Sequence, residues 1–388
     1  MESFYECDPN TEISTGENPE FNLPEGIPPL RSFYLYLSDS CNLRCRHCWI
    51  TPTYIEGKPT PGEVINILQL KAAVTEGKTL GLVNAKLTGG EPMLHPEFKE
   101  IATMLSEESL NMNMETNGTL IDREIARFLK NDTKINFISI SLDSANEKYH
   151  DSFRGSKGAY RAALNGLKYL VDAGYENVQI IMSPHRKNVS EVKELAELAE
   201  ANGAASLKLN PITNNGRGMQ MHENDETLSI KEVLELADLA RGELKQTVNI
   251  PILLHVPPAI KPLTEFTSTG GSCGDCRVDH ILGILGSGDV ALCGIGRTIP
   301  EFVYGNIATD SIRYIWLNHP KVVGLRDALC NFDNYPELCR NCVFIRKCRT
   351  GCVVQNYSDF GKLIWSSGIC QYAEEYGLFK DSRKKVSP

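Results

Sequence analysis

Short apolar runs alternate with longer segments of helical periodicity along residues 31–250. The strand-like runs lie at 32–37, 82–87, 111–115, 135–141, 177–182 and 206–209. Helical periodicity is found at about 97–108, 121–130, 158–173, 189–202 and 229–245. Strands and helices that alternate in this way predict a parallel sheet with helices outside it. A doubly wound open sheet is the alternative arrangement.

A further helix is predicted from residue 60 onward. Thr60 and Glu63 have the spacing of a capping box, with proline at the first helical position. Ile65, Leu68 and Ala72 then fall on one helical face. We therefore expect this helix to begin at Thr60 and to bury that face.

Polar and glycine-rich segments follow the predicted strands at the point where each strand ends. They lie at 41–48, 89–92, 117–118 and 141–143. Active sites of barrel-type sheets are built at the carboxyl ends of the strands. This placement favours a barrel over the doubly wound alternative.

Composition and charge exclude several classes of protein. The chain has 388 residues, 41% hydrophobic and 23% charged, which is typical of a soluble globular protein. A net charge of −9 argues against a general nucleic-acid binder. We also expect no membrane association, because no apolar run reaches the length of a span and the chain does not begin like a signal peptide. Thirteen cysteines in such a chain indicate metal in a reduced cytoplasm rather than disulfides.

Changes in composition divide the chain into five segments. An acidic, proline-rich lead-in covers residues 1–30, and the predicted barrel covers 31–250. A linker over 251–269 ends in Gly, Ser and Thr, and a cysteine-rich domain covers 270–372. Residues 373–388 form the C-terminal tail.

The cysteine loop after the first predicted strand offers three thiols. Cys41, Cys45 and Cys48 have three and then two residues between them, a spacing that can reach one face of an iron–sulfur cube. Three ligands leave one iron without a cysteine, and a substrate or cofactor can bind there. A zinc knuckle, or a structural cluster with its fourth cysteine elsewhere, is the alternative.

The loop resembles the signature of the radical S-adenosylmethionine (radical SAM) superfamily, Cys-x3-Cys-x2-Cys. A strand precedes it and Gly-Gly-Glu-Pro follows about forty residues later, as in that family. The resemblance implies a partial (β/α)6 TIM-type barrel over residues 31–250. It also implies that the open iron chelates the amino and carboxyl groups of SAM, and that the reduced cluster cleaves SAM to a 5′-deoxyadenosyl radical.

Candidate SAM contacts lie in three of the strand-end segments. Glycines let backbone carbonyls approach a ligand closely, and Glu91 can accept a hydrogen bond from the SAM ammonium. By resemblance, Ser141 and Arg154 contact the SAM carboxylate or ribose, and Asn117 lies near the ligand. The alternatives are an ordinary strand-to-helix turn for the glycine segment and a surface salt bridge for Arg154. The complete set of predicted SAM contacts is Gly89, Gly90, Glu91, Pro92, Asn117, Ser141 and Arg154.

Eight further cysteines lie between residues 273 and 370. On spacing alone they also suit two zinc ions. Their order resembles the SPASM extension of radical SAM enzymes, which holds two auxiliary [4Fe–4S] clusters and would bring the total to three. The resemblance assigns to the first auxiliary cluster Cys273, Cys276, Cys293 and Cys352. It assigns to the second Cys339, Cys342, Cys348 and Cys370. Cys7 and Cys330 remain outside these sets, and we interpret Cys330 as a spare thiol.

The resemblance implies an oxidoreductase that modifies a ribosomally synthesised peptide, with a thioether or carbon–carbon crosslink as the expected product. A small-molecule substrate, such as a tetrapyrrole or carbohydrate, is the alternative. A sulfatase-maturase-like oxidase is disfavoured, because Gly294 stands where those enzymes carry Asp. An electron-transfer or metal-storage protein is disfavoured by the complete SAM motifs.

Two protein partners are expected beside the peptide. An external electron donor, such as flavodoxin or ferredoxin, would reduce the cluster. Only about thirty residues precede the first strand, too few for a packed leader-binding domain. A leader would therefore be bound by a separate protein, by the barrel, or not at all. No general base stands out: Asp275, Asp289, Lys208 and Tyr304 are interpreted as surface or structural residues.

Overall fold

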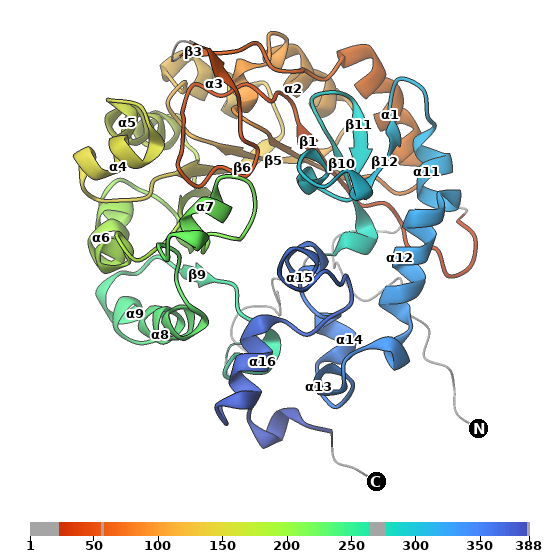
Figure 1. The fold of residues 1–388 in the computed structure, drawn as a ribbon. Coiled ribbons are helices and arrows are strands. Elements are labelled where there is room, and N and C mark those ends of the chain that lie inside the picture. The colour runs from red at the N-terminus through yellow and green to blue at the C-terminus, as the bar shows by residue number, and fades with distance from the viewer. Residues whose placement is uncertain (1–22, 56–57, 264, 266–276, 386–388) are drawn as a thin grey trace. The chain divides into compact units, whose positions relative to one another are not determined.

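A computed structural model describes residues 23–55, 58–263, 265 and 277–385 (Figure 1). The chain divides into two compact units. The larger unit contains residues 30–254 and 281–315, and the smaller contains 1–29, 255–280 and 316–388. Cys7, Cys273, Asp275 and Cys276 lie outside the described residues.

The larger unit is built on one sheet of ten strands in the order β12-β11-β10-β1-β4-β5-β6-β7-β8-β9. From β10 across to β9 all neighbours are parallel, whereas β11 and β12 are antiparallel additions at one edge. The strands are β1 Ser32–Tyr36, β4 Asn84–Thr88, β5 Asn111–Thr116, β6 Ile135–Ser141, β7 Val178–Met182, β8 Ser206–Leu209, β9 Ile252–Leu254, β10 Ile281–Ile284, β11 Asp289–Ala291 and β12 Val303–Asn306. A separate antiparallel pair joins β2 Tyr54–Ile55 to β3 Lys58–Pro59.

Helices connect the parallel strands and lie around the outside of the curved sheet (Figure 1). They are α1 Ile67–Thr79, α2 Phe98–Glu107, α3 Arg123–Asn131, α4 Glu147–Arg154, α5 Ala159–Asp172, α6 Val192–Ala201, α7 Gly218–Glu223, α8 Ile230–Arg241 and α9 Glu243–Thr247. The predicted α/β barrel fold is confirmed.

The core of this unit lies between the helices and the outer face of the sheet. Alternate strand residues on that face are apolar and almost fully buried, as period-2 side-chain alternation requires. They are Phe33, Leu35, Ala85, Leu87, Met112, Met114, Ile138, Ile140, Val178, Ile180, Leu207 and Leu209. The close approach of α1 illustrates the packing, because a Cβ on Gly77 would lie 3.0 Å from the ring of Phe33. The other face of the sheet is left for polar side chains.

The predicted helix start at residue 60 is wrong. α1 begins at Ile67, and the Asn66 side chain caps it by accepting hydrogen bonds from the backbone N–H groups of Leu68 and Gln69. Residues 60–63 instead pack against the cysteine loop, where the Gly62 N–H donates to Ser40 Oγ at 2.6 Å. This contact with the loop holds residues 60–63 in a non-helical conformation.

The predicted buried face of the same helix is wrong as well. Leu68 is 75% exposed and Ala72 is also exposed, although Ile65 is buried ahead of the helix. The helix buries Leu70 and Val74 instead. Starting the helix seven residues later rotates the face that meets the sheet.

The helix predicted over 229–245 is interrupted at Gly242, which separates α8 from α9. A capping box does occur here, where Ser229 and Glu232 satisfy each other's backbone N–H groups at the start of α8.

The smaller unit is mostly helical. Its helices are α12 Pro320–Cys330, α13 Glu337–Arg340, α14 Ile345–Cys348, α15 Val353–Phe360 and α16 Gly368–Glu375. α11 Ile312–Asn318 runs from the larger unit into this one. Near the C-terminus, Phe379 and Arg383 are buried, and the Arg383 guanidinium donates to the backbone oxygens of Ala259 and Lys261. No helix among the described residues is long and apolar enough to cross a membrane.

Candidate active site

The three cysteines of the predicted SAM cluster lie together after β1. Cys41 and Cys45 are buried, Cys48 is half-buried, and the three pack with Leu43 and Ala159. The Leu43 N–H donates to Cys41 Sγ at 3.4 Å. A single loop therefore brings the three thiols together, as the sequence predicts.

Two segments from elsewhere in the barrel hold this loop in place. The N–H groups of Arg44 and Arg46 donate to the carbonyls of Arg154 and Phe153, at the end of α4. Gly155 then ends the helix at φ +68°, where a Cβ would lie 2.6 Å from the Arg44 carbonyl oxygen. After β8, the Arg217 guanidinium donates to the carbonyl of Cys45 at 2.9 Å and to that of Pro52 at 2.7 Å.

The predicted glycine segment runs against the same loop. Gly89 has φ +129°, and a Cβ on Gly90 would lie only 2.2 Å from the Ser40 carbonyl oxygen. The Gly90 and Glu91 N–H groups donate to the carbonyls of Ser38 and Ser40. The glycines are thus required by the packing of two backbone segments, a reason the sequence alone did not supply.

Glu91 is completely buried at the end of this segment. Its carboxylate accepts hydrogen bonds from Thr116 Oγ1 at 2.8 Å and from the Asn117 N–H at 2.9 Å. Burial raises the pKa of Glu91 to about 7, although these hydrogen bonds oppose the shift. Pro92 follows it as the first residue of a short 3-10 turn.

Asn117 connects the third parallel strand with the cysteine loop. Its side-chain N–H group donates to Asn42 Oδ1 at 2.8 Å and lies 3.8 Å from Cys41 Sγ. Its oxygen accepts from the Thr119 N–H at 2.9 Å. The amide is therefore fixed beside a predicted cluster ligand.

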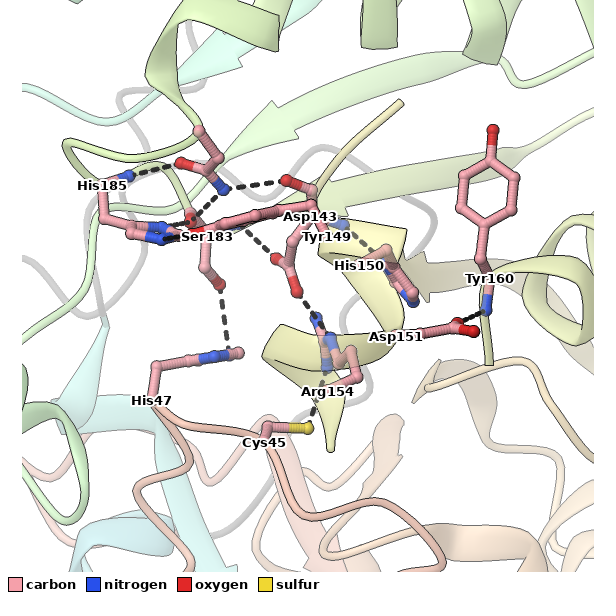
Figure 2. Close-up of polar contacts among 11 residues, drawn as sticks. Cys45, His47, Asp143, Tyr149, His150, Asp151, Arg154, Tyr160, Ser183 and His185 are labelled. Carbon is pink, nitrogen blue, oxygen red and sulfur yellow. Dashed lines mark hydrogen bonds and ion pairs between the residues drawn. The ribbon is translucent and has the colours of Figure 1, made fainter. Parts of the chain in front are cut away.

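Arg154 is buried and points toward the cysteine loop (Figure 2). Its Nε donates to Asp143 Oδ2 at 2.5 Å, and its Nη1 lies 3.6 Å from Cys45 Sγ. The surface-salt-bridge alternative is wrong, because neither partner is at the surface: the Asp143 side chain is fully buried and that of Arg154 is 8% exposed. Ser141 lies at the end of β6, two residues before Asp143. The structure thus places both predicted residues at the same edge of the sheet.

Asp143 is the centre of a buried polar network that sequence reasoning did not single out (Figure 2). Its carboxylate also accepts from the Ser183 N–H at 2.8 Å, and its carbonyl accepts from Asn188 Nδ2 at 2.8 Å. Its N–H donates to His150 Nδ1 at 3.2 Å. Although burial opposes the shift, the Arg154 guanidinium lowers the pKa of Asp143 to about 2. The network joins the ends of β6 and β7 to α4, and through Arg154 to Cys45.

A stack of three rings includes two histidines that lie beside this network. His47 stacks on Phe153 with ring centroids 4.8 Å apart, and Phe153 stacks on His185 at 4.5 Å. His47 Nε2 lies 3.3 Å from Ser183 Oγ, whereas its buried Nδ1 has no hydrogen-bond partner within the described part of the chain. Burial lowers the pKa of His47 to about 3, so the ring is neutral at physiological pH.

The residues present fit an iron–sulfur cluster. Burial raises the pKa of Cys41 to about 12 and raises that of Cys45, so thiolates form there only with a compensating positive charge. Hydrogen-bond donors from Leu43, Asn117 and Arg154 already surround their sulfurs. Donors of this kind tune cluster potentials.

The four cysteines predicted to hold the second auxiliary cluster all lie in the smaller unit. They line one cavity, together with apolar residues that include Phe344 and Phe379. Burial raises the pKa of Cys339 and of Cys370 to about 12. Among the described residues, no three or more His, Cys, Asp or Glu side chains converge on the position of a single ion. The structure thus brings the four predicted ligands to one cavity.

The first auxiliary set stays a prediction. Cys273 and Cys276 lie outside the described residues, while Cys293 lies in the larger unit and Cys352 in the smaller. Cys330 is disulfide-bonded, so its interpretation as a spare thiol is wrong, and the expectation of metal rather than disulfides fails for this cysteine.

Gly294, directly after Cys293, has a structural reason to be glycine. A Cβ there would lie 2.1 Å from the ring of Tyr36 and 2.2 Å from that of Trp49. These two rings meet edge to face at 5.6 Å and fill the space that an Asp side chain would need.

Sequence reasoning missed Asp143 and Arg217 as site residues. Asp143 could have been recognised from the sequence, because it ends the same segment that supplies Ser141 and precedes Arg154 by eleven residues. Arg217 could not, since it lies 172 residues from Cys45 in an irregular segment after β8.

Comparisons with known proteins agree with this geometry. Family models match residues 35–199, described as the radical SAM superfamily, and residues 273–343, described as an iron–sulfur cluster-binding domain, SPASM. The chain is 31% identical to the Fe-coproporphyrin III synthase of Methanosarcina barkeri over 88% of both chains. It is 28% identical to the antilisterial bacteriocin subtilosin biosynthesis protein AlbA of Bacillus subtilis, over 94% of this chain and 75% of AlbA.

A crystal structure shares the fold. Streptococcus suis SuiB bound to S-adenosylmethionine superposes with a TM-score of 0.67 at 16% identity, covering 88% of this chain and 77% of SuiB. The two matched domains imply [4Fe–4S] clusters and SAM as cofactors. The chain belongs to the radical SAM superfamily and carries a SPASM iron–sulfur cluster-binding domain.

Proposed function

We propose that this enzyme modifies a ribosomally synthesised peptide in the cytoplasm, forming a thioether or carbon–carbon crosslink. The observation that carries the proposal is the cavity lined by all four cysteines of the second auxiliary set. A complete set of this kind resembles the peptide-modifying SPASM enzymes. SuiB, which shares the fold, has been crystallised bound to the precursor peptide SuiA.

Each part of the site has a task in this proposal. When bound, the cluster and SAM supply a 5′-deoxyadenosyl radical. Cys41, Cys45 and Cys48 hold the cluster and leave one iron for SAM. Glu91 accepts a hydrogen bond from the SAM ammonium, and Arg154, fixed by Asp143, offers its remaining N–H groups to the SAM carboxylate. These residues bind and orient, while the hard chemistry belongs to the cofactor.

The test is anaerobic incubation of the reconstituted enzyme with SAM, dithionite and the short peptides encoded beside its gene. The proposal expects 5′-deoxyadenosine together with a peptide that has lost two hydrogen atoms per crosslink, detected by mass spectrometry. The variant with Cys41, Cys45 and Cys48 changed to Ala is the matched control and should form neither product. Peptides that stay unmodified while the wild-type enzyme cleaves SAM with another substrate would refute the peptide assignment.

A tetrapyrrole substrate is the second candidate, favoured by the 31% identity with Fe-coproporphyrin III synthase. The same assay with an iron coproporphyrin in place of the peptides separates the two. A tetrapyrrole product and no peptide product would decide for this candidate.

We also propose an external electron donor, such as flavodoxin or ferredoxin, and a separate leader-binding protein. A cavity beside Cys45 is lined by Arg44, Arg46 and Arg217, and Arg46 is paired with Glu226 at 2.7 Å. Positive charge next to the cluster loop of a chain with net charge −9 suits an acidic redox partner. Reduction rates that fall with added salt, and fall further in an Arg44→Glu variant, are the expected result.

A further inference from the structure

The inner face of the barrel sheet is polar, in contrast to its apolar outer face. Strand residues that alternate with the buried core positions point to this face. Most carry hydroxyl, amide or charged groups: Tyr34, Tyr36, Lys86, Thr88, Glu115, Ser139, Ser141, Gln179, Ser206 and Lys208. Three of them, Lys86, Glu115 and Lys208, are charged at neutral pH, and none of these three has a role in the SAM site described above.

Lys86 and Glu115 form an ion pair between the neighbouring strands β4 and β5. Lys86 Nζ lies 2.5 Å from Glu115 Oε1, and the same ammonium lies 5.1 Å from the ring centre of Tyr34. Although burial alone would raise it, the Lys86 ammonium lowers the pKa of Glu115. These two residues therefore neutralise each other.

Lys208 lies on β8, beyond β6 and β7 from this pair. It is partly buried, and its ammonium is close enough for the Glu115 carboxylate and the Lys86 ammonium to affect its pKa. Within the described residues, no carboxylate lies within 4.0 Å of its ammonium and no hydrogen-bond acceptor contacts it. Two ammonium groups and one carboxylate leave one positive charge without a partner on this face.

A purely structural role does not explain this charge. Taking an ammonium partly out of water without a partner costs free energy, and burial lowers the pKa of Lys208 accordingly. Its neighbours in register, Ile181 and Leu253, are apolar and give it nothing to bind. An unpaired charge that faces inward on a barrel wall is a candidate for ligand binding.

The position of Lys208 relates it to the SAM site. Ser141, a predicted SAM contact, pairs with Ile181, and Ile181 pairs with Lys208. Two strand spacings separate Ser141 from Lys208, about 10 Å. This places the ammonium beside the predicted SAM position on the same inner face, where a substrate has to lie.

We propose that Lys208 binds a carboxylate of the substrate, an acidic side chain or the C-terminus of the peptide that enters the barrel. That the carboxylate belongs to a peptide rests on the proposed function, whereas the binding of a carboxylate by Lys208 does not. The Lys86–Glu115 pair leaves one positive charge in total, so the face accepts one carboxylate. A charge-assisted bond in this setting predicts a preference of about 10- to 100-fold for Glu over Gln in the bound segment.

The test measures protection of the Lys208 amine in the reconstituted holoenzyme. Anaerobic reductive methylation, read by mass spectrometry, is carried out with saturating SAM and either acetyl-Gly-Glu-Gly-amide or its Gln counterpart. The proposal expects the Glu peptide to slow labelling of Lys208 and the Gln peptide to leave it unchanged. Lys168, an exposed lysine on α5, is the internal control and should label equally in both samples.

Variants and a second probe distinguish the sources of the carboxylate. K208R should retain the Glu-over-Gln preference of the wild-type enzyme, K208Q should lose it, and K168Q should behave like wild type. Protection by iron coproporphyrin, whose side chains are carboxylates, and not by the Glu peptide would keep the carboxylate site and refute the peptide function.

Three results would overturn the proposal whether or not the enzyme modifies peptides. The first is equal labelling of Lys208 with every probe. The second is a K208Q variant that keeps its preference for Glu. The third is a SAM dissociation constant about tenfold higher in K208Q, which would assign Lys208 to the SAM carboxylate instead.

Discussion

Replacing Asp143 with Asn would leave the buried Arg154 guanidinium without a carboxylate. The Asp143 side chain is fully buried, and its oxygens accept from Arg154 Nε and the Ser183 N–H. Removing one partner of a buried ion pair costs about 3–5 kcal/mol, because the other charge stays buried and unpaired. A pKa of about 2 against an ordinary 3.8 independently gives about 2 kcal/mol at neutral pH.

The two figures together predict a loss of about 2–5 kcal/mol in the free energy of unfolding. For a unit of this size, the midpoint of thermal unfolding falls by about 2–4 °C per kcal/mol, so we expect a decrease of roughly 4–20 °C. The assay is anaerobic thermal unfolding of reconstituted D143N and wild type at one scan rate. SAM cleavage should also decrease, because Arg154 loses the group that points it toward Cys45.

The pH dependence provides a second readout. The folded-state pKa of Asp143 is depressed, so its stabilisation is present above about pH 4 and is lost as the pH falls toward 2. The difference in the free energy of unfolding between wild type and D143N should therefore decrease as the pH falls from about 4 to about 2.

A matched control is available at the surface. Arg123 and Asp172 form a pair at 3.2 Å whose side chains are 64% and 58% exposed. D172N should cost less than about 1 kcal/mol. Equal midpoints for D143N and D172N would refute the reasoning, as would a D143L/R154M double variant that is less stable than D143N, since removal of both charges should recover stability.

Three further predictions concern the two cluster sites. In the proposed function an ionised Glu91 binds the SAM ammonium, and burial raises the pKa of Glu91 to about 7. The SAM dissociation constant should then rise about tenfold per pH unit below 7, and E91Q should lose this dependence. Gly294→Asp should destabilise the enzyme and confer no sulfatase-peptide oxidation, because Tyr36 and Trp49 occupy the space. When the four cysteines that line the cavity are changed to Ser, the enzyme should lose about four irons. The smaller unit should then become sensitive to limited proteolysis, while the cluster on the Cys41–Cys48 loop stays intact.

Each of these predictions has a contradicting outcome. Equilibrium dialysis that gives the same SAM affinity at pH 6 and 8 would contradict ionisation of Glu91 as the controlling step. A G294D enzyme with wild-type unfolding would mean that the aromatic rings move aside at little cost. An iron content that is unchanged after the cysteine substitutions would contradict the assignment of the second auxiliary cluster to these cysteines.

Much of the larger unit was predictable because its strands are short, apolar and regularly spaced. β6 and β8 match their predicted limits, β5 and β7 differ from theirs by one residue at one end, and β4 starts two residues later and ends one residue later than predicted. The cysteine loop and the glycine segment were predictable because cluster and SAM chemistry restrict residue type and spacing. The segment at 60–66 was not, because its conformation depends on a hydrogen bond to Ser40, twenty-two residues away.

The inner face of the barrel shows a second limit. Lys86, Glu115 and Lys208 lie in three separate strands and carry no local motif, so only the strand register places them on one face. Lys208 was considered as a general base and interpreted as structural, whereas its lack of a partner becomes visible only when its neighbours are known. The strands β10–β12 were missed for a related reason, because they follow a composition change that resembles a separate domain.

The central claim is that the Cys41–Cys48 loop holds a SAM-cleaving cluster distinct from the auxiliary clusters. Anaerobic iron and sulfide counting on the variant with Cys41, Cys45 and Cys48 changed to Ala tests it directly, together with an assay for 5′-deoxyadenosine. The account predicts that about eight irons remain and that SAM cleavage is lost. If almost no iron remained, or if zinc replaced it, the assignment of the auxiliary clusters would be wrong. If this variant still cleaved SAM, the Cys41–Cys48 loop would not hold the SAM-cleaving cluster.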